Sequence, residues 1–292
     1  MEKTMKTIFI FINSYLLCLL IGNAQGIQTK ELYAELGVKK IIEHLYVINV
    51  DGSIRDSILI EERYLDSLGR TTKRVIRDTS KYVDTYTYVY NEKSQLSRIK
   101  GSTTRRNIYL QENIFKYNDK GLVRIEKTSI NGKTGGRTKY TYNSKDQLRE
   151  EFITSYSPSK YYKKINYLYN SSGQILKAIA TAKTRKQEVR EYEYDEKGNL
   201  IYIHLIKNGN EPKFFIEYGF DDENRRIKEK YYCRITSRVP EVYANILSQK
   251  GDIRVVKYKY DEKGLLEEKK QWLHNIFIGL KRYSYEDAAG VN

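Results

Sequence analysis

The feature that most constrains the fold of this chain is a nine-residue motif that recurs along most of its length. Its most complete copy, residues 192–200 (YEYDEKGNL), reads aromatic-x-aromatic-Asp-x-x-Gly-x-apolar. Successive copies, counted from the second aromatic position (the anchor), lie 25 to 27 residues apart, with one longer interval of 40. The nine anchors are Leu65, Tyr90, Tyr117, Tyr142, Tyr169, Tyr194, Phe220, Tyr260 and Tyr285. A period of this length predicts a repeat architecture in which each copy is one structural unit.

Each copy contains the residues of a tight turn. Asp or Asn follows eight of the nine anchors, and these short side chains hydrogen-bond the nearby backbone and initiate turns. Four positions past the anchor, most copies have glycine, which adopts positive φ at no steric cost. These glycines are Gly69, Gly121, Gly173, Gly198 and Gly264, and the equivalent residues elsewhere are Ser94, Asp146 and Asn224. An apolar residue usually follows two positions later, so each copy is predicted to be a β-hairpin.

The hairpin reading predicts which side chains share a face. Side chains alternate along a strand, so Tyr192 and Tyr194 are expected on the same face. Pairing Tyr194 with Leu200 would then place Tyr192 opposite Tyr202. Stacked copies would form an aromatic ladder beside the turns, each pair adding about 0.2–1 kcal/mol over Ala–Ala. Farther from the turns the same face is expected to become polar, as at Arg98, Lys177 and Glu268.

Nine such units predict a single all-β domain over residues 25–292, with about eighteen antiparallel strands and little helix. Open twisted sheets rarely exceed ~10 strands without curling or splitting, so one long curled or spiralling sheet is expected. The interval of 40 holds an insertion near 233–251, in which Pro240 and Gly251 bracket apolar residues and predict a short helix. Insertions into repeats are often on the binding face, although a tolerated surface decoration is the simpler interpretation.

Residues 1–24 are typical of a secretory signal peptide. Two lysines precede an apolar run over 8–21, which is too short for an ordinary membrane span, and small residues permit cleavage before Gln25. Leu17 stands where a lipoprotein would need a small residue before Cys18, so a cleaved soluble product is expected. We therefore expect an exported protein that is periplasmic, attached to the cell surface or secreted, and not an integral membrane protein.

The charge balance is strongly basic, with 52 Lys and Arg against 37 Asp and Glu and a net charge of +15. Such a charge favours acidic partners, namely anionic polysaccharide, cell-surface phosphate or nucleic acid. Nucleic acid is the least expected partner, because basic residues alternate with acidic ones along most strands and the chain is exported. After cleavage only Cys233 would remain, so no intramolecular disulfide is expected.

Catalytic and metal-binding patterns find little support in the sequence. The three histidines, His44, His204 and His274, lie far apart and have no partner at metal-ligand spacing. There is no nucleophile elbow and no phosphate-binding glycine loop. We therefore expect no metal, no cofactor and no enzymatic activity. An acidic pair brought together in a cleft of the curled sheet stays open as an alternative, because carboxylates are plentiful.

The motif resembles the YD repeat of the RHS and teneurin families, whose core is Tyr-Asp-x-x-Gly-Asn/Arg-Leu. Residues 194–200 fit this core fully, 260–266 nearly so, and 65–70 keep the turn without the tyrosine. The resemblance covers about residues 56–286 and implies a spiralling β-shell, often labelled carbohydrate-binding. The chain is much shorter than the large relatives and shows no toxin domain, so their cargo role is not implied. Its leader also resembles those of Bacteroidetes-type exported proteins.

Departures from the repeat are the best places to expect function, because packing already explains the repeats. The largest departure carries Arg234, Arg238 and Tyr243, and Trp272 is the only tryptophan of the chain. Aromatic and arginine side chains dominate binding hot spots. We therefore predict an exported non-enzymatic scaffold that binds glycan or protein through these residues. The alternatives are a polysaccharide-acting enzyme with a carboxylate pair, or an immunity or accessory protein that neutralises a partner.

Overall fold

The computed structural model describes residues 30–49, 53–78, 82–104, 110–156, 160–182, 185–207, 214–233, 252–273 and 276–287. Within these ranges the chain forms eighteen antiparallel strands and one short helix, α2 (Lys30–Glu35). The all-β class and the number of strands are as the repeat predicts. The signal peptide expected at 1–24 and the helix expected between Pro240 and Gly251 lie outside the described residues.

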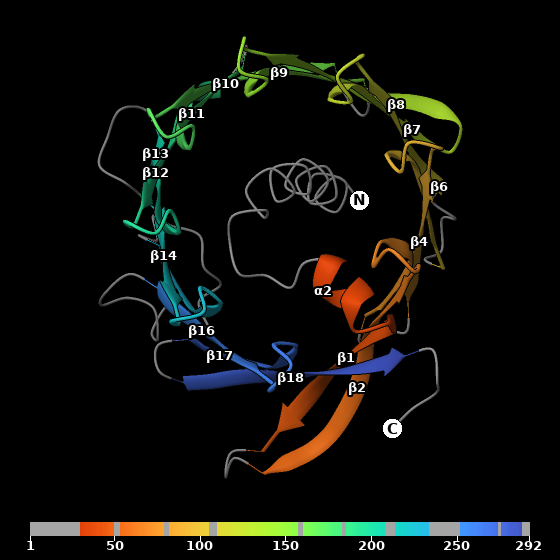
Figure 1. Cartoon of the computed structure of the whole chain (residues 1–292), viewed down its shortest axis with the longest axis vertical. Helices are drawn as coiled ribbons and strands as arrows, with labels where there is room; N and C mark the ends of the chain where they lie inside the picture. The colour runs from red at the N-terminus through yellow and green to blue at the C-terminus, as the bar shows by residue number, and fades with distance from the viewer. Residues whose placement is uncertain are drawn as a thin grey trace.

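The eighteen strands follow one another along the chain. They are β1 (Val38–Ile48), β2 (Ile54–Leu65), β3 (Thr71–Arg77), β4 (Val83–Tyr90), β5 (Leu96–Thr103), β6 (Leu110–Tyr117), β7 (Val123–Ile130), β8 (Lys133–Tyr142), β9 (Leu148–Ser155), β10 (Tyr161–Tyr169), β11 (Ile175–Ala182), β12 (Arg185–Tyr194), β13 (Leu200–Lys207), β14 (Phe214–Phe220), β15 (Arg226–Cys233), β16 (Asp252–Tyr260), β17 (Leu266–Leu273) and β18 (Ile276–Asp287). Each strand pairs with the next, and Figure 1 shows the resulting ring end-on.

The ring closes because the last strand pairs with the first. β18 lies antiparallel to β1, with Tyr285 opposite Ile41, and β1 pairs on its other edge with β2. The sheet is thus a closed barrel, which corrects the open curled or spiralling sheet that the sequence predicts. In the ninth copy of the motif the anchor strand is β18, and its partner strand is contributed by the other end of the chain. Closure gives both edge strands a hydrogen-bonded neighbour, which an open sheet lacks.

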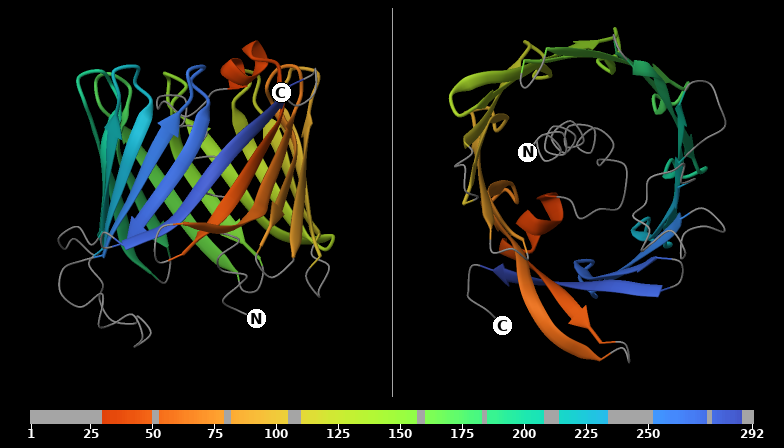
Figure 2. Two further views of the ribbon diagram at one scale, coloured as in Figure 1. Left: turned by 90° about the horizontal axis from the view of Figure 1, so that it is seen from below. Right: turned by 180° about the vertical axis from the view of Figure 1, so that it is seen from behind.

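The turns have the geometry that the motif predicts. In all eight complete copies the residue four past the anchor has positive φ, from 59° at Ser94 to 85° at Gly198. The Asp or Asn after the anchor accepts a hydrogen bond from the backbone N–H four residues on, at 2.7–3.0 Å. These turns gather at one end of the barrel, the end at which α2 also lies (Figure 2). The Asn131-Gly132 turn at the other end also has positive φ at both residues.

A β-bulge beside every one of these turns changes the predicted register. Tyr194 does lie opposite Leu200, but the next pairs are Glu193 with Tyr202 and Tyr192 with Ile203. The prediction that Tyr192 faces Tyr202 is therefore wrong, because the extra bulge residue inverts the alternation of the second strand. The same inversion moves the polar positions farther from the turns to the opposite face. These positions are Arg98, Lys177 and Glu268, which pair with Val89, Leu168 and Lys259.

The aromatic ladder lies on the inner face of the barrel. Tyr33 of α2, which is inside the ring in Figure 1, packs with Ile41, Leu65 and Tyr285, so the anchor side chains point inward. A second inner cluster joins Tyr140, Leu148, Tyr167, Ile175, Ala178, Tyr192 and Leu200. Tyr192 is only 2% exposed and Leu200 only 1%, so the predicted buried stripe beside the turns is confirmed.

Hydrogen bonds from the anchors join each repeat to the one before it. All seven tyrosine anchors donate their hydroxyl to a backbone carbonyl of the preceding hairpin, at 2.6–3.0 Å. Tyr194, for example, donates to the carbonyl of Ile175, which stands six residues past the preceding anchor. Three glutamines add a second row at the turns, as where Gln174 Nε2 donates to the carbonyl of Gly198 at 3.2 Å. A tyrosine at the anchor therefore contributes a hydrogen bond through its hydroxyl as well as packing through its ring.

Candidate functional site

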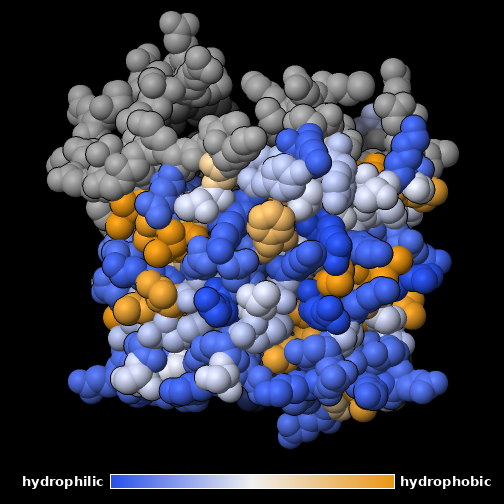
Figure 3. Space-filling model, turned by 90° about the horizontal axis from the view of Figure 1, so that it is seen from above, coloured by the Kyte–Doolittle hydropathy of each residue, from blue (hydrophilic) through white to orange (hydrophobic). Residues whose placement is uncertain are grey.

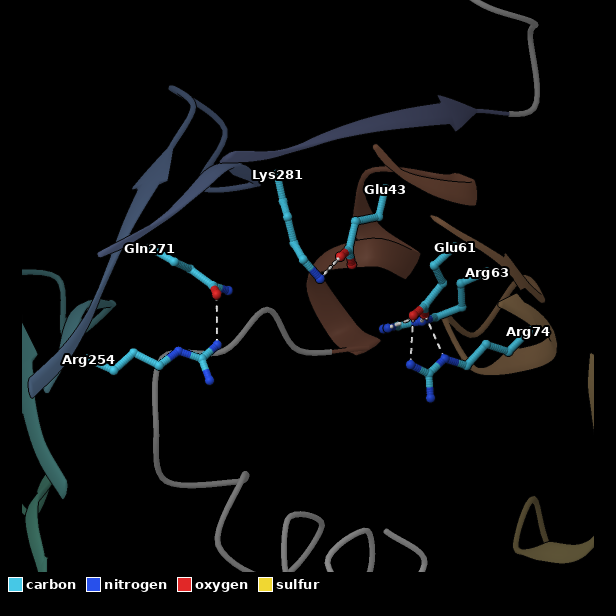
Figure 4. A network of polar contacts seen from close by, with 7 residues as sticks. All are labelled: Glu43, Glu61, Arg63, Arg74, Arg254, Gln271 and Lys281. Carbon is cyan, nitrogen blue, oxygen red and sulfur yellow. Dashed lines mark hydrogen bonds and ion pairs between the residues drawn. The ribbon is translucent and has the colours of Figure 1, made fainter. Parts of the chain in front are cut away.

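A pocket of about 280 Å³ lies on the inner face, where the two ends of the chain meet. Its lining comes from α2, β1, β2 and β15 to β18, so it exists only because the ring closes. Five tyrosines, three carboxylates and three cationic side chains line it, together with Ile41 and Leu266. Figure 4 shows part of the polar network around the pocket, with side chains from β1, β2, β3 and β16 to β18.

Two of the pocket's carboxylates are tightly held by cationic side chains. Glu61 of β2 contacts both Arg74, at 2.6 Å, and Arg63, at 2.9 Å. Burial alone would raise the pKa of Glu61, but the hydrogen bonds and charges of these two arginines hold it below its usual value. Glu43 of β1 accepts from Lys281 of β18 across the seam of the ring.

Glu229 of β15 is the centre of a second cluster on the same wall. Its carboxylate contacts Arg226 at 2.9 Å and accepts hydrogen bonds from the hydroxyls of Tyr231 and Tyr258. Burial would raise its pKa, but Arg226 and the two hydroxyls lower it below the usual range. Since Glu61 and Glu229 both keep the charged form, neither supplies the protonated acid that an acid–base pair requires.

Lys269 of β17 differs from the other cations of the pocket. No described carboxylate lies within ion-pair distance of its Nζ, which lies 5.3 Å from the centroid of the Tyr258 ring. Burial lowers the pKa of Lys269, and the charge of Glu229 offsets only part of this effect. Among the described residues, Lys269 is therefore a cation of the pocket without a matched anion.

Two further buried carboxylates lie elsewhere on the inner face. Glu126 accepts from Asn113 at 2.6 Å and from the Tyr140 hydroxyl at 2.9 Å, and Glu151 on the next hairpin accepts from Tyr167 at 2.9 Å. Burial raises the pKa of both, that of Glu151 to about 7. In each case a tyrosine hydroxyl is the donor that a buried carboxylate needs. The sequence does not indicate that Glu126 and Glu151 are buried, because a glutamate on a strand is normally expected to be exposed to solvent.

The outer face is covered mainly by charged residues in cross-strand pairs. Figure 3 shows one side of this face, where apolar side chains form separate patches among hydrophilic ones. Cross-strand ion pairs join neighbouring strands there. They are Arg98 with Glu112, Lys164 with Glu150, Lys177 with Glu191, and Lys230 with Glu217, at 2.6 to 3.5 Å.

One part of the outer face departs from this alternation. Lys228 of β15 stands directly opposite Lys257 of β16, which stands directly opposite Lys270 of β17. We call these three residues the lysine row. Like charges directly opposite one another destabilise a sheet. Lys270 has a partner in Glu268 at 2.8 Å, whereas the exposed Lys257 has its Nζ 5.3 Å from the centroid of the Trp272 ring.

Trp272 thus lies beside the lysine row. Its ring packs edge-on against Phe277, with centroids 5.5 Å apart, and is half-buried on the outer face. Of the four predicted binding residues it alone can be placed, because Arg234, Arg238 and Tyr243 lie outside the described residues. The sequence indicated Trp272 because it is the only tryptophan. It did not indicate the lysine row, because Lys228 and Lys257, which are 29 positions apart, and Lys257 and Lys270, which are 13 apart, become neighbours only through strand pairing.

Neither metal ligands nor membrane helices can be assigned in the described ranges. No group of three or more His, Cys, Asp or Glu residues is placed there to hold a metal ion. None of the helical segments there has the length and apolar character needed to cross a bilayer. His204 contacts Glu193 at 2.9 Å on the outer face, and His44 lies in β1.

Comparison with known proteins identifies no family for the chain. Neither a family model nor a curated protein matches it. Among solved structures, a TcdB2–TccC3–TEV crystal structure covers 82% of this chain at 12% identity and a TM-score of 0.39. A porin-like protein from Bacteroides uniformis covers 85% at 9% identity and a TM-score of 0.32, and this chain covers 96% of it. The Photorhabdus luminescens Tc holotoxin pore covers 82% at 11% identity and a TM-score of 0.30. The chain spans only 15% of the first of these and 18% of the last. Likenesses this low carry no functional argument.

Proposed function

We propose that this chain is an exported, non-enzymatic repeat scaffold that binds an acidic polysaccharide through the lysine row and Trp272. The observation that carries the proposal is the direct opposition of three lysines on adjacent strands. Adjacent strands are about 4.8 Å apart, so the backbone positions of the three lysines form a short, regularly spaced line across the sheet. Glu268 pairs with Lys270, and a polymer with regularly spaced carboxylates supplies counter-charges for Lys228 and Lys257, which have no ion-pair partner among the described residues.

Two further features support a polyanion over a neutral glycan. The net charge of +15 attracts polyanions at long range and raises their local concentration. The Trp272 ring holds the Lys257 ammonium by a cation–π contact, which is worth about 0.5–1 kcal/mol at an exposed site, so the lysine is partly ordered before any partner arrives. Pre-ordering lowers the entropy lost on binding.

The test compares polygalacturonate with neutral dextran in titrations of the purified full chain at two salt concentrations. We expect polygalacturonate alone to bind, with an affinity that falls as salt rises. Replacing all three residues of the lysine row by glutamine should weaken this binding at least tenfold. The matched control replaces Lys100, Lys127 and Lys139, which lie on the outer face of other hairpins, and removes the same charge.

The two triple variants separate a defined site from general charge attraction. Equal losses in both would mean that the polymer responds only to net charge, and the lysine row would then have no special role. A separate Trp272→Ala variant should weaken binding less than the triple variant, because its effect passes through Lys257. Binding of dextran as tightly as polygalacturonate would contradict the polyanion assignment.

A further inference from the structure

The pocket on the inner face has more positive than negative charge. The charged side chains that line it or contact its lining carboxylates are five cations and three carboxylates. They are Arg63, Arg74, Arg226, Lys269 and Lys281, against Glu43, Glu61 and Glu229. Every one of these carboxylates already has a cation in contact. The excess positive charge is therefore not balanced from within the site.

Lys269 is the cation of the pocket for which no ion-pair partner is present among the described residues. It is largely buried on the inner face, and no described carboxylate is in ion-pair contact with it. An ionised side chain removed from water without a partner is strongly unfavourable, whereas the same group beside an anion is not. Glu229, the carboxylate whose charge acts most strongly on Lys269, already contacts Arg226 and two tyrosine hydroxyls. A bound anion would supply what Lys269 lacks.

The walls of the pocket add a preference for a ring. Tyr258, Tyr260, Tyr283 and Tyr285 line it from neighbouring strands, and Tyr33 of α2 lines it as well. The hydroxyls of three of them are fixed by hydrogen bonds, to Glu229, to the carbonyl of Arg226 and to the carbonyl of Leu266. Their rings are thus held in place and offer flat apolar surface next to charged groups. A sugar ring, with apolar faces and a polar edge, fits this combination.

The size of the pocket limits the ligand to one such ring. Its volume of about 280 Å³ lies just below the roughly 300–1,000 Å³ typical of ligand pockets. We propose that the pocket binds a single acidic sugar unit, with the Lys269 ammonium as the partner of its carboxylate. The unit is either a free monosaccharide acid or one end of an acidic polysaccharide. The site is separate from the lysine row, because Lys269 and Lys270 are consecutive in β17 and point to opposite faces.

Titrations of the full chain with three small ligands test the chemistry. Galacturonate has the ring, the hydroxyls and the carboxylate, galactose lacks the carboxylate, and benzoate lacks the hydroxyls. We expect galacturonate to bind at least tenfold more tightly than either of the others. Galactose binding as tightly would overturn the role of the carboxylate, and benzoate binding as tightly would overturn the sugar assignment.

Lys269→Met tests the residue, because methionine keeps most of the aliphatic packing and removes the charge. We expect it to lose the preference for galacturonate over galactose and to raise the melting temperature of the unliganded protein. Lys127→Met, the control at an exposed lysine on the outer face of β7, should change neither. A Lys269→Met variant that binds galacturonate like the wild type would refute the proposal.

A measurement on the unmodified protein covers the case in which the variant fails to fold. Limited acetylation followed by mass spectrometry reports how accessible the Lys269 amine is. Galacturonate should protect Lys269 and leave Lys270 unprotected, while galactose should protect neither. Equal acetylation of Lys269 with both sugars would overturn the proposal.

The two sites can also be separated by experiment. The triple glutamine variant of the lysine row should still bind galacturonate. Lys269→Met should still bind polygalacturonate if the polymer uses the lysine row, and it should lose the polymer if a chain end enters the pocket. In either case, galacturonate binding by the wild type tests whether the pocket binds an acidic sugar. Polymer binding by the triple variant tests whether the lysine row binds the polysaccharide.

Discussion

Glu151 offers a direct test of how well the inner face is shielded from water. The residue is only 4% exposed, and its carboxylate accepts a hydrogen bond from the Tyr167 hydroxyl at 2.9 Å. Burial raises its pKa to about 7 from a usual 4.5; the Tyr167 hydrogen bond acts against this shift, and the nearby Glu126 adds to it. The folded chain therefore keeps this proton over a pH range in which the unfolded chain has released it.

The size and the sign of the effect follow from that difference. A shift of about 2.5 pKa units corresponds to ~3 kcal/mol. Because the folded pKa is the higher one, this stability is fully present below about pH 4.5 and is lost as the pH rises through about 7. Glu151→Gln keeps an oxygen for the Tyr167 hydroxyl and cannot ionise. We expect its free energy of unfolding to exceed that of the wild type by ~3 kcal/mol near pH 8.5 and to match it within ~1 kcal/mol near pH 4.

Urea unfolding followed by circular dichroism at the two pH values measures both differences. The control is Glu150→Gln, the adjacent residue, which points outward and is paired with Lys164 at 2.6 Å. A half-exposed pair of this kind contributes little, so the control should lose no more than about 1 kcal/mol near pH 8.5 and should not be stabilised. If Glu151→Gln and the wild type differ by the same amount at both pH values, Glu151 is solvated and the inner face is not the buried surface that we describe.

Three further predictions concern the repeat itself. Gly264→Ala should cost about 1–2 kcal/mol from positive φ alone, because no atom lies within 4 Å of the added Cβ. Gly69→Ala should cost at least ~1 kcal/mol more, because its Cβ would lie 1.9 Å from the Lys30 carbonyl oxygen of α2. Equal losses in chemical denaturation would show that α2 does not pack on this turn. Phe220 is one of the two anchors, with Leu65, that have no hydroxyl, so Phe220→Tyr should stabilise the chain by about 0.5–1.5 kcal/mol. Tyr194→Phe should destabilise it by a similar amount. A Phe220→Tyr variant that melts below the wild type would contradict the role of the anchor hydroxyls. Burial raises the pKa of several anchors, that of Tyr194 to about 12 from 10.0. Because the pKa is higher in the folded chain, the free energy of unfolding should fall as the pH rises from about 10 through 12. A urea midpoint that is unchanged between pH 9 and pH 11 would contradict this.

The turns could be predicted because their chemistry is local. An Asp or Asn that caps the backbone and a residue that tolerates positive φ define the loop within five residues, so Asp195 and Gly198 specify it without help from the rest of the fold. The strand count followed from the number of loops. Helix α2 gave no comparable signal, because its six residues are too few for a helical pattern and it is positioned by packing of Tyr33.

The faces of the second strands could not be predicted because one extra residue reverses them. Without the bulge, Arg98 would point inward and Ile99 outward; with it, Ile99 pairs with the inward Tyr88. Both candidate sites depend on this reversal. Lys269 enters the pocket and Lys270 joins the lysine row only because the bulge beside Tyr260 sets the register of β17.

The closure of the ring connects the repeat to both proposed sites. A repeat alone gives every hairpin equivalent neighbours, so no single hairpin has surroundings that differ from those of the others. Closure pairs β1 with β18, and there Tyr33, Glu43 and Glu61 line one pocket together with side chains from β15 to β18. The lysine row lies on the outer face of the same strands, β15 to β17. A binding function in this chain is therefore best sought at the seam, where the symmetry of the repeat is broken on both faces of one short stretch of sheet.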